Sequence, residues 1–283
     1  MKLLSYGLDR RMEPRLAFSL RGFAVDVMRA SLWMKEDRNA QDFLNLASSL
    51  RLALEDWGRS FSLLKELEDA FQSLAFENLS VYKRPVAMPE SDIVYFPPLA
   101  DPPAIRFFHA FSSQASSLFE FGQAQTLHGH RASLKHAGLT PQGEISAVIA
   151  ADKEGGTPQI AGYAAFNNWV DMDQEGGLAT GKASSMGPWF ISADEMEPHK
   201  MGTGFNLDMQ LRVNGQAEKD GRFSKMAYSF TQMLEIAAQT GIKAGDILCS
   251  GSPLDSSNLP KTSRADVIDL EIQVLGVLNT PIE

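Results

Sequence analysis

The block of sequence that decides the fold of this 283-residue chain begins at Arg212-Val-Asn-Gly215 and ends at Gly245-Asp-Ile-Leu-Cys-Ser-Gly-Ser-Pro253. Apolar and polar residues alternate from Leu207 to Val213 and run into Asn-Gly, the strongest short hairpin signal. Apolar residues then recur at helical spacing from Phe230 to Ala238, and Gly241 ends that helix. A hairpin, a short helix and a glycine-flanked apolar strand in this order predict a mixed α+β unit.

Further strands are predicted at both ends of the chain. Near the C-terminus, Ile268 to Val274 alternates apolar and polar residues, which is typical of a half-buried strand. Near the N-terminus, Arg15–Leu20 and Gly22–Asp26 have similar patterns, and Arg21-Gly22 is the expected turn between them.

A long helical pattern follows these first strands. Its apolar residues fall on one helical face and run from Phe43 to Leu64, and Gly58 is expected to split it into two helices. The stripe could be a coiled-coil surface for a partner. We favour packing against the chain's own N-terminal sheet, because fewer than four heptads are present.

Five prolines between Pro89 and Pro103 exclude a helix and disfavour a central strand. We therefore expect a domain junction near residue 90. The predicted fold is α+β, with a small N-terminal α/β domain over residues 1–90 and a larger, strand-rich domain over residues 91–283.

Composition narrows the class of protein. A formal net charge of −9 argues against non-specific nucleic-acid binding, since phosphate contacts need a basic face. No apolar run approaches the roughly 18 residues of a membrane span, and the N-terminus does not read as a signal peptide. The lone Cys249 needs no oxidising compartment. We expect a cytoplasmic protein with small-molecule or protein partners.

Four ordered stretches, covering roughly residues 95 to 280, resemble the fumarylacetoacetate hydrolase family. They are Pro97 to Phe111, Gly162 to Trp169, Gly181-Lys182 with Gly187 to Asp194, and the block from Arg212 to Pro253. The resemblance implies a C-terminal mixed β-roll or sandwich around a pocket, and a homodimer. It also implies Mg²⁺- or Mn²⁺-assisted hydrolysis, decarboxylation or tautomerisation of small oxo acids or 1,3-dicarbonyl compounds. A hard cation held by carboxylates stabilises the enolate that forms in such reactions.

The family's four metal carboxylates are largely missing from this sequence. Phe107 stands in the place of the first aspartate, Gln142 and Glu144 in the places of two glutamates, and Asn168 in the place of the last aspartate. Gln142 and Glu144 are two residues apart, so they face the same side of a strand. The resemblance thus implies a metal site on Glu144, Gln142 and Asn168 that has lost most of its charge. We expect no tightly bound ion, with weakly bound Mg²⁺ or Mn²⁺ as the alternative.

Other family positions are partly kept. The catalytic histidine aligns with Gln114 and a substrate-fixing arginine with Met172, while Lys182 matches an oxyanion-stabilising lysine. Ser252 matches a substrate-binding threonine. With Met172 and Ser252, the resemblance makes Gly251 and His109 substrate-binding positions. We also expect a Lys182–Glu144 ion pair in place of the ion.

Three further features have simpler interpretations. The clustered histidines His128, His130 and His136 could ligate a metal or supply the lost base, but they lack companion ligands, so exposed loop positions are favoured. The acidic run from Asp171 to Glu175 lacks calcium-loop spacing and is expected to be a solvated loop. Cys249 lies in an apolar strand and is expected to be a buried, inert thiol.

Two functions remain open. The first is an enzyme acting on a small oxo acid, with Lys182 and Glu144 as catalytic residues. Desolvation could raise the pKa of Glu144 enough for it to act as a general base without a metal. The second is a non-catalytic homologue that binds a ligand or assembles with itself, because a fold does not guarantee chemistry.

Overall fold

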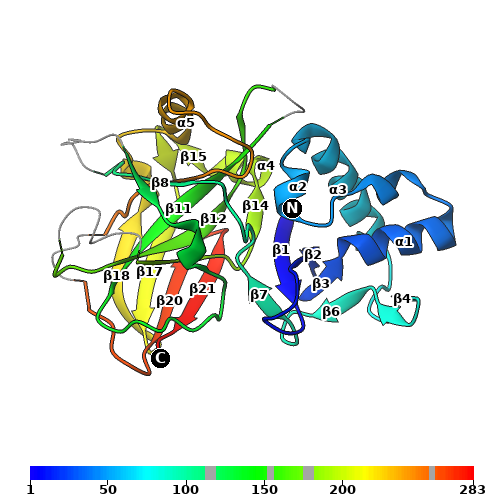
Figure 1. Cartoon of the computed structure of the whole chain (residues 1–283), viewed down its shortest axis with the longest axis horizontal. Coiled ribbons are helices and arrows are strands. Elements are labelled where there is room, and N and C mark those ends of the chain that lie inside the picture. Colours follow the sequence, from blue (N-terminus) through cyan, green and yellow to red (C-terminus); the bar gives the residue numbers. More distant parts are fainter. Residues whose placement is uncertain (112–118, 152–155, 175–181, 255–258) are drawn as a thin grey trace.

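The structure is a computed structural model that describes residues 1–111, 119–151, 156–174, 182–254 and 259–283. It is an α+β fold, with helices α1, α2 and α3 grouped at one end and most strands at the other (Figure 1). No described helix has the length and apolar character needed to cross a membrane.

The N-terminal segment forms the antiparallel end of the large sheet, with helices packed against it. Its strands are β1 (Lys2–Gly7), β2 (Arg15–Leu20), β3 (Phe23–Asp26) and β6 (Ala87–Pro89). The predicted Arg21-Gly22 turn is confirmed, since both residues have positive φ angles. A two-stranded hairpin of β4 (Ser80–Val81) and β5 (Arg84–Pro85) precedes β6.

Three helices lie between β3 and β4: α1 (Val27–Arg38), α2 (Leu50–Ala53) and α3 (Trp57–Gln72). The sequence pattern missed α1, which begins where the Asp26 carboxylate accepts a hydrogen bond from the Arg29 N–H at 2.8 Å. The break expected at Gly58 is wrong. It falls between α2 and α3, and Gly58 lies within α3.

Thirteen of the described strands form one large sheet. At its centre, β11 (Thr140–Ala150) pairs with β12 (Gln159–Val170) along almost their whole lengths. β14 (Phe190–Ser192) connects β12 to β1, and β7 (Val94–Phe96) pairs with β1. On the other side follow β19 (Ile247–Cys249), β8 (Ile105–Phe108) and β9 (Phe119–Gly122). β13 (Ala183–Met186) joins β12 and the short β10 (Leu127–His128).

A second sheet packs across this one. It contains β17 (Asp208–Val213), β18 (Gln216–Arg222), β20 (Val267–Ile272) and β21 (Gly276–Pro281). The Asn214-Gly215 hairpin is confirmed, with both residues at positive φ. Gly143 of β11 permits close packing, because a Cβ there would lie 2.4 Å from a methyl group of Leu270. The predicted helix is α5 (Phe230–Ala238), whose N-terminus carries a capping box at Ser229.

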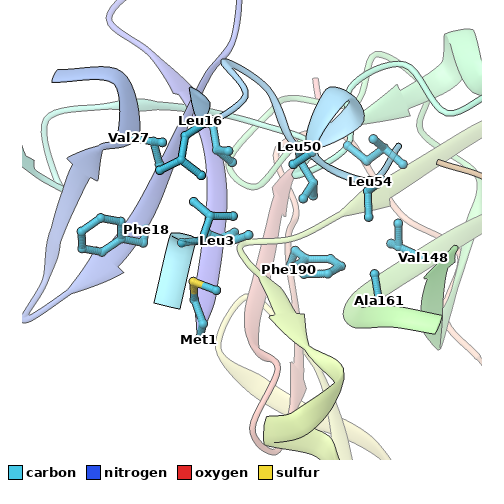
Figure 2. Close-up of a cluster of buried hydrophobic side chains, with 14 of the residues drawn as sticks. Met1, Leu3, Leu16, Phe18, Val27, Leu50, Leu54, Val148, Ala161 and Phe190 are labelled. Atoms are coloured by element: carbon cyan, nitrogen blue, oxygen red, sulfur yellow. The ribbon is translucent and has the colours of Figure 1, made fainter. Parts of the chain in front are cut away.

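One buried apolar cluster joins the N-terminal segment to the central sheet. Figure 2 shows Leu3 and Leu16 on one side and Val148 and Phe190 on the other, with Leu54 among them. Phe43 and Leu64 also belong to this cluster, so the predicted apolar stripe packs inside the chain. A division into domains at residue 90 stays a prediction, because this core and the β1–β14 pairing extend across it.

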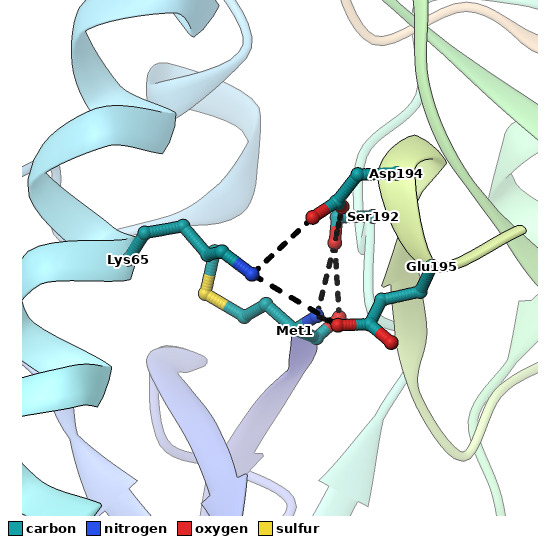
Figure 3. A network of polar contacts seen from close by, with 5 residues as sticks. All are labelled: Met1, Lys65, Ser192, Asp194 and Glu195. Atoms are coloured by element: carbon teal, nitrogen blue, oxygen red, sulfur yellow. Dashed lines mark hydrogen bonds and ion pairs between the residues drawn. The ribbon is translucent and has the colours of Figure 1, made fainter. Parts of the chain in front are cut away.

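A polar network lies at the same junction (Figure 3). The Met1 ammonium contacts Glu195 Oε1 at 2.7 Å, and Lys65 of α3 contacts Asp194 Oδ2 at 3.2 Å. Asp194 and Glu195 belong to α4 (Ala193–Met196), which follows β14 directly. The network therefore ties α3 and β1 to the end of β14.

Candidate functional site

The candidate site centres on Glu144, a carboxyl group buried in the middle of the large sheet. Its residue is 2% exposed. The Gly251 N–H donates a hydrogen bond to Glu144 Oε2 at 2.9 Å, and the Asn168 side-chain amide donates another to the carboxyl. Desolvation raises the pKa of Glu144 to about 8, and the two hydrogen bonds oppose that rise in part.

Strand register explains why these groups meet. Gln142 lies directly across from Asn168 on β12, and Glu144 is two residues further on the same face. Gln142 and Glu144 lie on β11 two positions apart, which agrees with the predicted shared face. Gly251 follows β19, which pairs with β11 on its other side. It has φ +74, and a Cβ there would lie 2.7 Å from the carbonyl oxygen of Phe108, so glycine is needed to present this N–H.

The side chains packed beside the Glu144 carboxyl are apolar. Phe107 is 2% exposed and packs edge-on against Phe166, with ring centroids 5.9 Å apart. Phe166 is the cross-strand neighbour of Glu144. Cys249 is a free, buried thiol, and its pKa is raised by burial and by the nearby Glu144. The prediction of a buried cysteine is therefore confirmed.

The described residues do not fit a divalent cation at this site. Glu144 is its one carboxylate, Phe107 offers no ligand atom, and the Asn168 amide points a donor at Glu144. No group of three or more His, Cys, Asp or Glu side chains suited to a metal occurs in the described part of the chain. A hard cation needs more compensating charge than one carboxylate supplies.

One polar atom at this site is left without a partner. The Asn168 side-chain oxygen is buried, and no hydrogen-bond donor reaches it in the described structure. A buried oxygen in that position costs about 1 to 3 kcal/mol relative to a hydrogen-bonded one. Since the Asn168 NH2 group donates to the carboxyl, the unpaired oxygen is a cost that the amide bears in making that hydrogen bond.

The predicted Lys182–Glu144 ion pair is wrong. Lys182 is exposed and binds the carboxylate of Asp171 instead. Its position just before β13 leaves the ammonium in solvent, where an ion pair needs no desolvation. In the predicted acidic run, Asp173 also pairs with a lysine, Lys261, at 2.6 Å, and Glu175 lies outside the described residues.

The remaining predicted positions are more exposed than Glu144. Ser252 follows Gly251 and is half-buried, with its hydroxyl accepting the Leu254 N–H at 3.2 Å. His109 is exposed, and Met172 is 42% exposed. Gln114 lies outside the described residues. A substrate role for His109, Gly251, Met172 and Ser252, and a catalytic role for Lys182, stay predictions.

The expectation of exposed histidines is wrong for His130, which is 8% exposed. Its Nδ1 accepts the Asn279 N–H at 3.1 Å, and its ring packs edge-on against Tyr95. Burial, helped by Arg131, lowers its pKa to about 4, so the ring is neutral and structural. His128 is half-buried, and desolvation lowers its pKa too.

Sequence reasoning did not assign Asn168 its hydrogen bond to Glu144, nor Arg106 any role. Arg106 donates to Asp246 Oδ2 at 2.6 Å and to the Gly241 carbonyl at 2.7 Å, with both charged groups buried. The pair fixes β8 to the start of β19, the strand whose other end leads to Gly251. A charged residue inside the apolar Ile105 to Phe108 run was the available signal.

Comparisons with known proteins agree with this architecture. Residues 109–283 match the family model described as fumarylacetoacetate (FAA) hydrolase C-terminal. The oxaloacetate tautomerase YisK of Bacillus subtilis (strain 168) is 27% identical over 180 residues, which are 56% of this chain and 58% of that protein. The 2,4-didehydro-3-deoxy-L-rhamnonate hydrolase of Sphingomonas sp. (strain SKA58) is 25% identical over 148 residues, 47% of this chain and 50% of that one. The chain thus spans about half the length of these curated relatives.

Solved structures match over the whole chain. Maleylpyruvate hydrolase from Sphingobium sp. SYK-6, in complex with manganese(II) and pyruvate, has a TM-score of 0.72 at 16% identity and covers 100% of this chain and 98% of its own. An HpcE protein from Mycobacterium smegmatis has a TM-score of 0.69 at 15% identity, covering 100% and 99%. At these identities the likeness shows the fold, and the family match covers more than half of the chain. The chain belongs to the fumarylacetoacetate hydrolase family.

Proposed function

We propose that this protein is a metal-independent enzyme that moves a proton on a small oxo acid or 1,3-dicarbonyl compound, with Glu144 as the acid–base group. The observation that carries the proposal is the buried Glu144 carboxyl, whose pKa is raised to about 8 and whose position is fixed by Gly251 and Asn168. A proton-transfer group works best when its pKa lies near the working pH.

Keto–enol tautomerisation fits this group better than carbon–carbon hydrolysis. Tautomerisation needs one proton removed from carbon and one returned to oxygen, and a single carboxyl of intermediate pKa can do both. Hydrolysis also needs a strong charge stabiliser for the enolate, and Lys182 is engaged with Asp171. A relative, the YisK protein, carries the name oxaloacetate tautomerase, which supports the same choice.

The second candidate is a non-catalytic homologue. It is favoured by the burial of Phe107 and by the 2% exposure of Glu144. In that case the carboxyl is a structural group, and Phe107 and Phe166 fill space that the family uses for chemistry.

Enol–keto conversion of oxaloacetate, followed by ultraviolet absorbance, separates the two. We expect turnover that is the same with EDTA, Mg²⁺ or Mn²⁺, and that Glu144→Gln lowers by at least a hundredfold. Glu235→Gln, an exposed change on α5, is the matched control and keeps full activity. Absence of turnover with oxaloacetate and a panel of acylpyruvates would support the non-catalytic homologue, and dependence on added metal would overturn the metal-independent mechanism.

Assembly and location are also proposals. We propose a cytoplasmic homodimer on the strength of the family, and sedimentation of the purified chain measures the oligomeric state.

A further inference from the structure

A small cavity of about 210 Å³ lies on the opposite side of the large sheet from Glu144. It is lined by residues of β12, of the hairpin of β15 (Lys200–Met201) and β16 (Gly204–Phe205), and of the first turn of α5. Figure 1 shows β15 and α5 next to one another at one end of the molecule. Tyr163 of β12 lines the cavity, and it is three residues from Phe166, the cross-strand neighbour of Glu144, so the two side chains leave opposite faces of the strand.

The phenol of Tyr163 is the first observation that points to a ligand. The residue is 2% exposed, with its ring edge-on to Phe205 at 5.1 Å and to Phe230 at 5.3 Å. Its hydroxyl has no hydrogen-bond partner in the part of the chain that the structure describes. Burial raises the pKa of this phenol, and the charge of Glu197 adds to the rise, so the hydroxyl is a neutral donor. Because this oxygen is not among the fully buried polar atoms that lack a partner, it is reachable from the cavity, where an acceptor can complete its hydrogen bonding.

The opening turn of α5 supplies further donors. Ser229, Phe230 and Thr231 all line the cavity. The first N–H groups of a helix have no intrahelical acceptor, and the helix dipole places partial positive charge there. The capping box engages Ser229 with Gln232, two positions beyond Phe230, and leaves the N–H groups of Phe230 and Thr231 out of its two bonds.

The charges around the rim do not oppose an anion. Lys200 lines the cavity and contacts Glu197 Oε1 at 2.5 Å, so its ammonium offsets the Glu197 charge that acts on Tyr163. The partial positive charge of the α5 N-terminus then favours an anion in the cavity. The aromatic rings of Phe205, Phe230 and Tyr163 give the remaining wall an apolar character.

We propose that this cavity is a second ligand site, separate from the Glu144 site, that binds a short-chain carboxylic acid. The carboxylate would accept hydrogen bonds from the Tyr163 hydroxyl and from the first turn of α5, and the hydrocarbon end would lie against the rings. A volume of about 210 Å³ is roughly that of seven water molecules at about 30 Å³ each, which suits a short acid and excludes a nucleotide.

Binding of propionate to the full chain tests the proposal, with acetamide and inorganic phosphate as comparison probes. Isothermal titration and saturation-transfer NMR measure affinity in wild type, Tyr163→Phe and Glu144→Gln. Tyr163→Phe keeps the ring packing and removes the donor, so we expect propionate affinity to fall about tenfold or more. Glu144→Gln separates the two sites and should bind propionate as wild type does. Circular dichroism confirms that each variant is folded.

Four results would overturn the proposal. They are no propionate binding by folded wild-type protein, equal affinity in wild type and Tyr163→Phe, loss of binding in Glu144→Gln, and acetamide or phosphate binding as tightly as propionate. Loss of oxaloacetate turnover in Glu144→Gln leaves this outcome unaffected, so failure of either site is recognised separately.

Discussion

Replacement of Glu144 by glutamine should make the protein more stable at high pH, and the gain should grow as the pH rises. Glutamine keeps an oxygen that accepts the Gly251 N–H, and it keeps the size of the side chain. What it removes is the cost of ionising a carboxyl that is 2% exposed. Glutamine has one acceptor oxygen where the carboxyl has two, but that difference does not depend on pH, so the pH dependence of the effect isolates the electrostatic part of the site.

The magnitude follows from the pKa. The folded value of about 8 lies above the ordinary 4.5, so the folded protein holds the Glu144 proton more tightly than the unfolded chain. The favourable contribution to stability is complete below pH 4.5 and is lost as the pH rises toward 8. At about 1.4 kcal/mol per pH unit, the loss amounts to roughly 3 kcal/mol at pH 7 and about 5 kcal/mol above pH 8.

Urea unfolding of both proteins from pH 5 to 8.5, followed by tryptophan fluorescence, measures the difference in free energy of unfolding. Relative to wild type, Glu144→Gln should gain stability by about 1 kcal/mol per pH unit between pH 5 and 8. Glu235→Gln removes an exposed charge and should run parallel to wild type. Parallel curves for Glu144→Gln and wild type would refute the reasoning, because they would mean that Glu144 ionises as easily in the fold as in water.

The remaining predictions concern the buried ion pair and the lost ligands. Arg106→Met leaves Asp246 charged and unpaired, so it should lower the free energy of unfolding in urea by about 3 to 5 kcal/mol. The double variant Arg106→Met/Asp246→Leu should lower it much less. A double variant as unstable as the single one would contradict this account. The triple variant Phe107→Asp/Gln142→Glu/Asn168→Asp restores the family's carboxylates and should bind Mn²⁺ measurably in calorimetry, while wild type under the same conditions should not. Equal Mn²⁺ affinity in both would show that the amides already suffice.

Local sequence patterns predicted much of the fold because they depend on local backbone geometry. Asn214-Gly215 requires two positive φ angles, and the structure has them. Phe230 to Ala238 repeats at helical spacing and forms α5. The pattern failed at α1, whose buried residues Val27, Ala30, Ser31 and Met34 make only a weak apolar stripe, and whose start depends on the Asp26 carboxylate. A polar side chain that also accepts from Tyr6 and Arg15 cannot be recognised as a cap from spacing alone.

At the candidate site, too, local features could be predicted from the sequence and contacts between distant residues could not. The shared face of Gln142 and Glu144 follows from the two-residue period of a strand, and the register with Asn168 agrees with it. The partner of Lys182 does not follow, because it depends on which carboxylate the chain brings nearest in space. Asp171 lies 11 residues before Lys182 in sequence. The pattern predicts only a solvated loop there, and in the structure that loop supplies the ion-pair partner of Lys182.

We propose that the loss of metal ligands and the raised pKa of Glu144 have one physical cause. In a site with four carboxylates, a cation neutralises the charge, and each carboxylate can stay ionised while buried. With Phe107, Gln142 and Asn168 in three of those places, no compensating charge remains beside Glu144 in the described structure. The carboxyl then relieves the cost of burial by keeping its proton, and the two hydrogen bonds it accepts reduce that cost without removing it. On this proposal, replacing the ligands converts an anionic metal site into a neutral acid, and such an acid near pH 7 can transfer a proton.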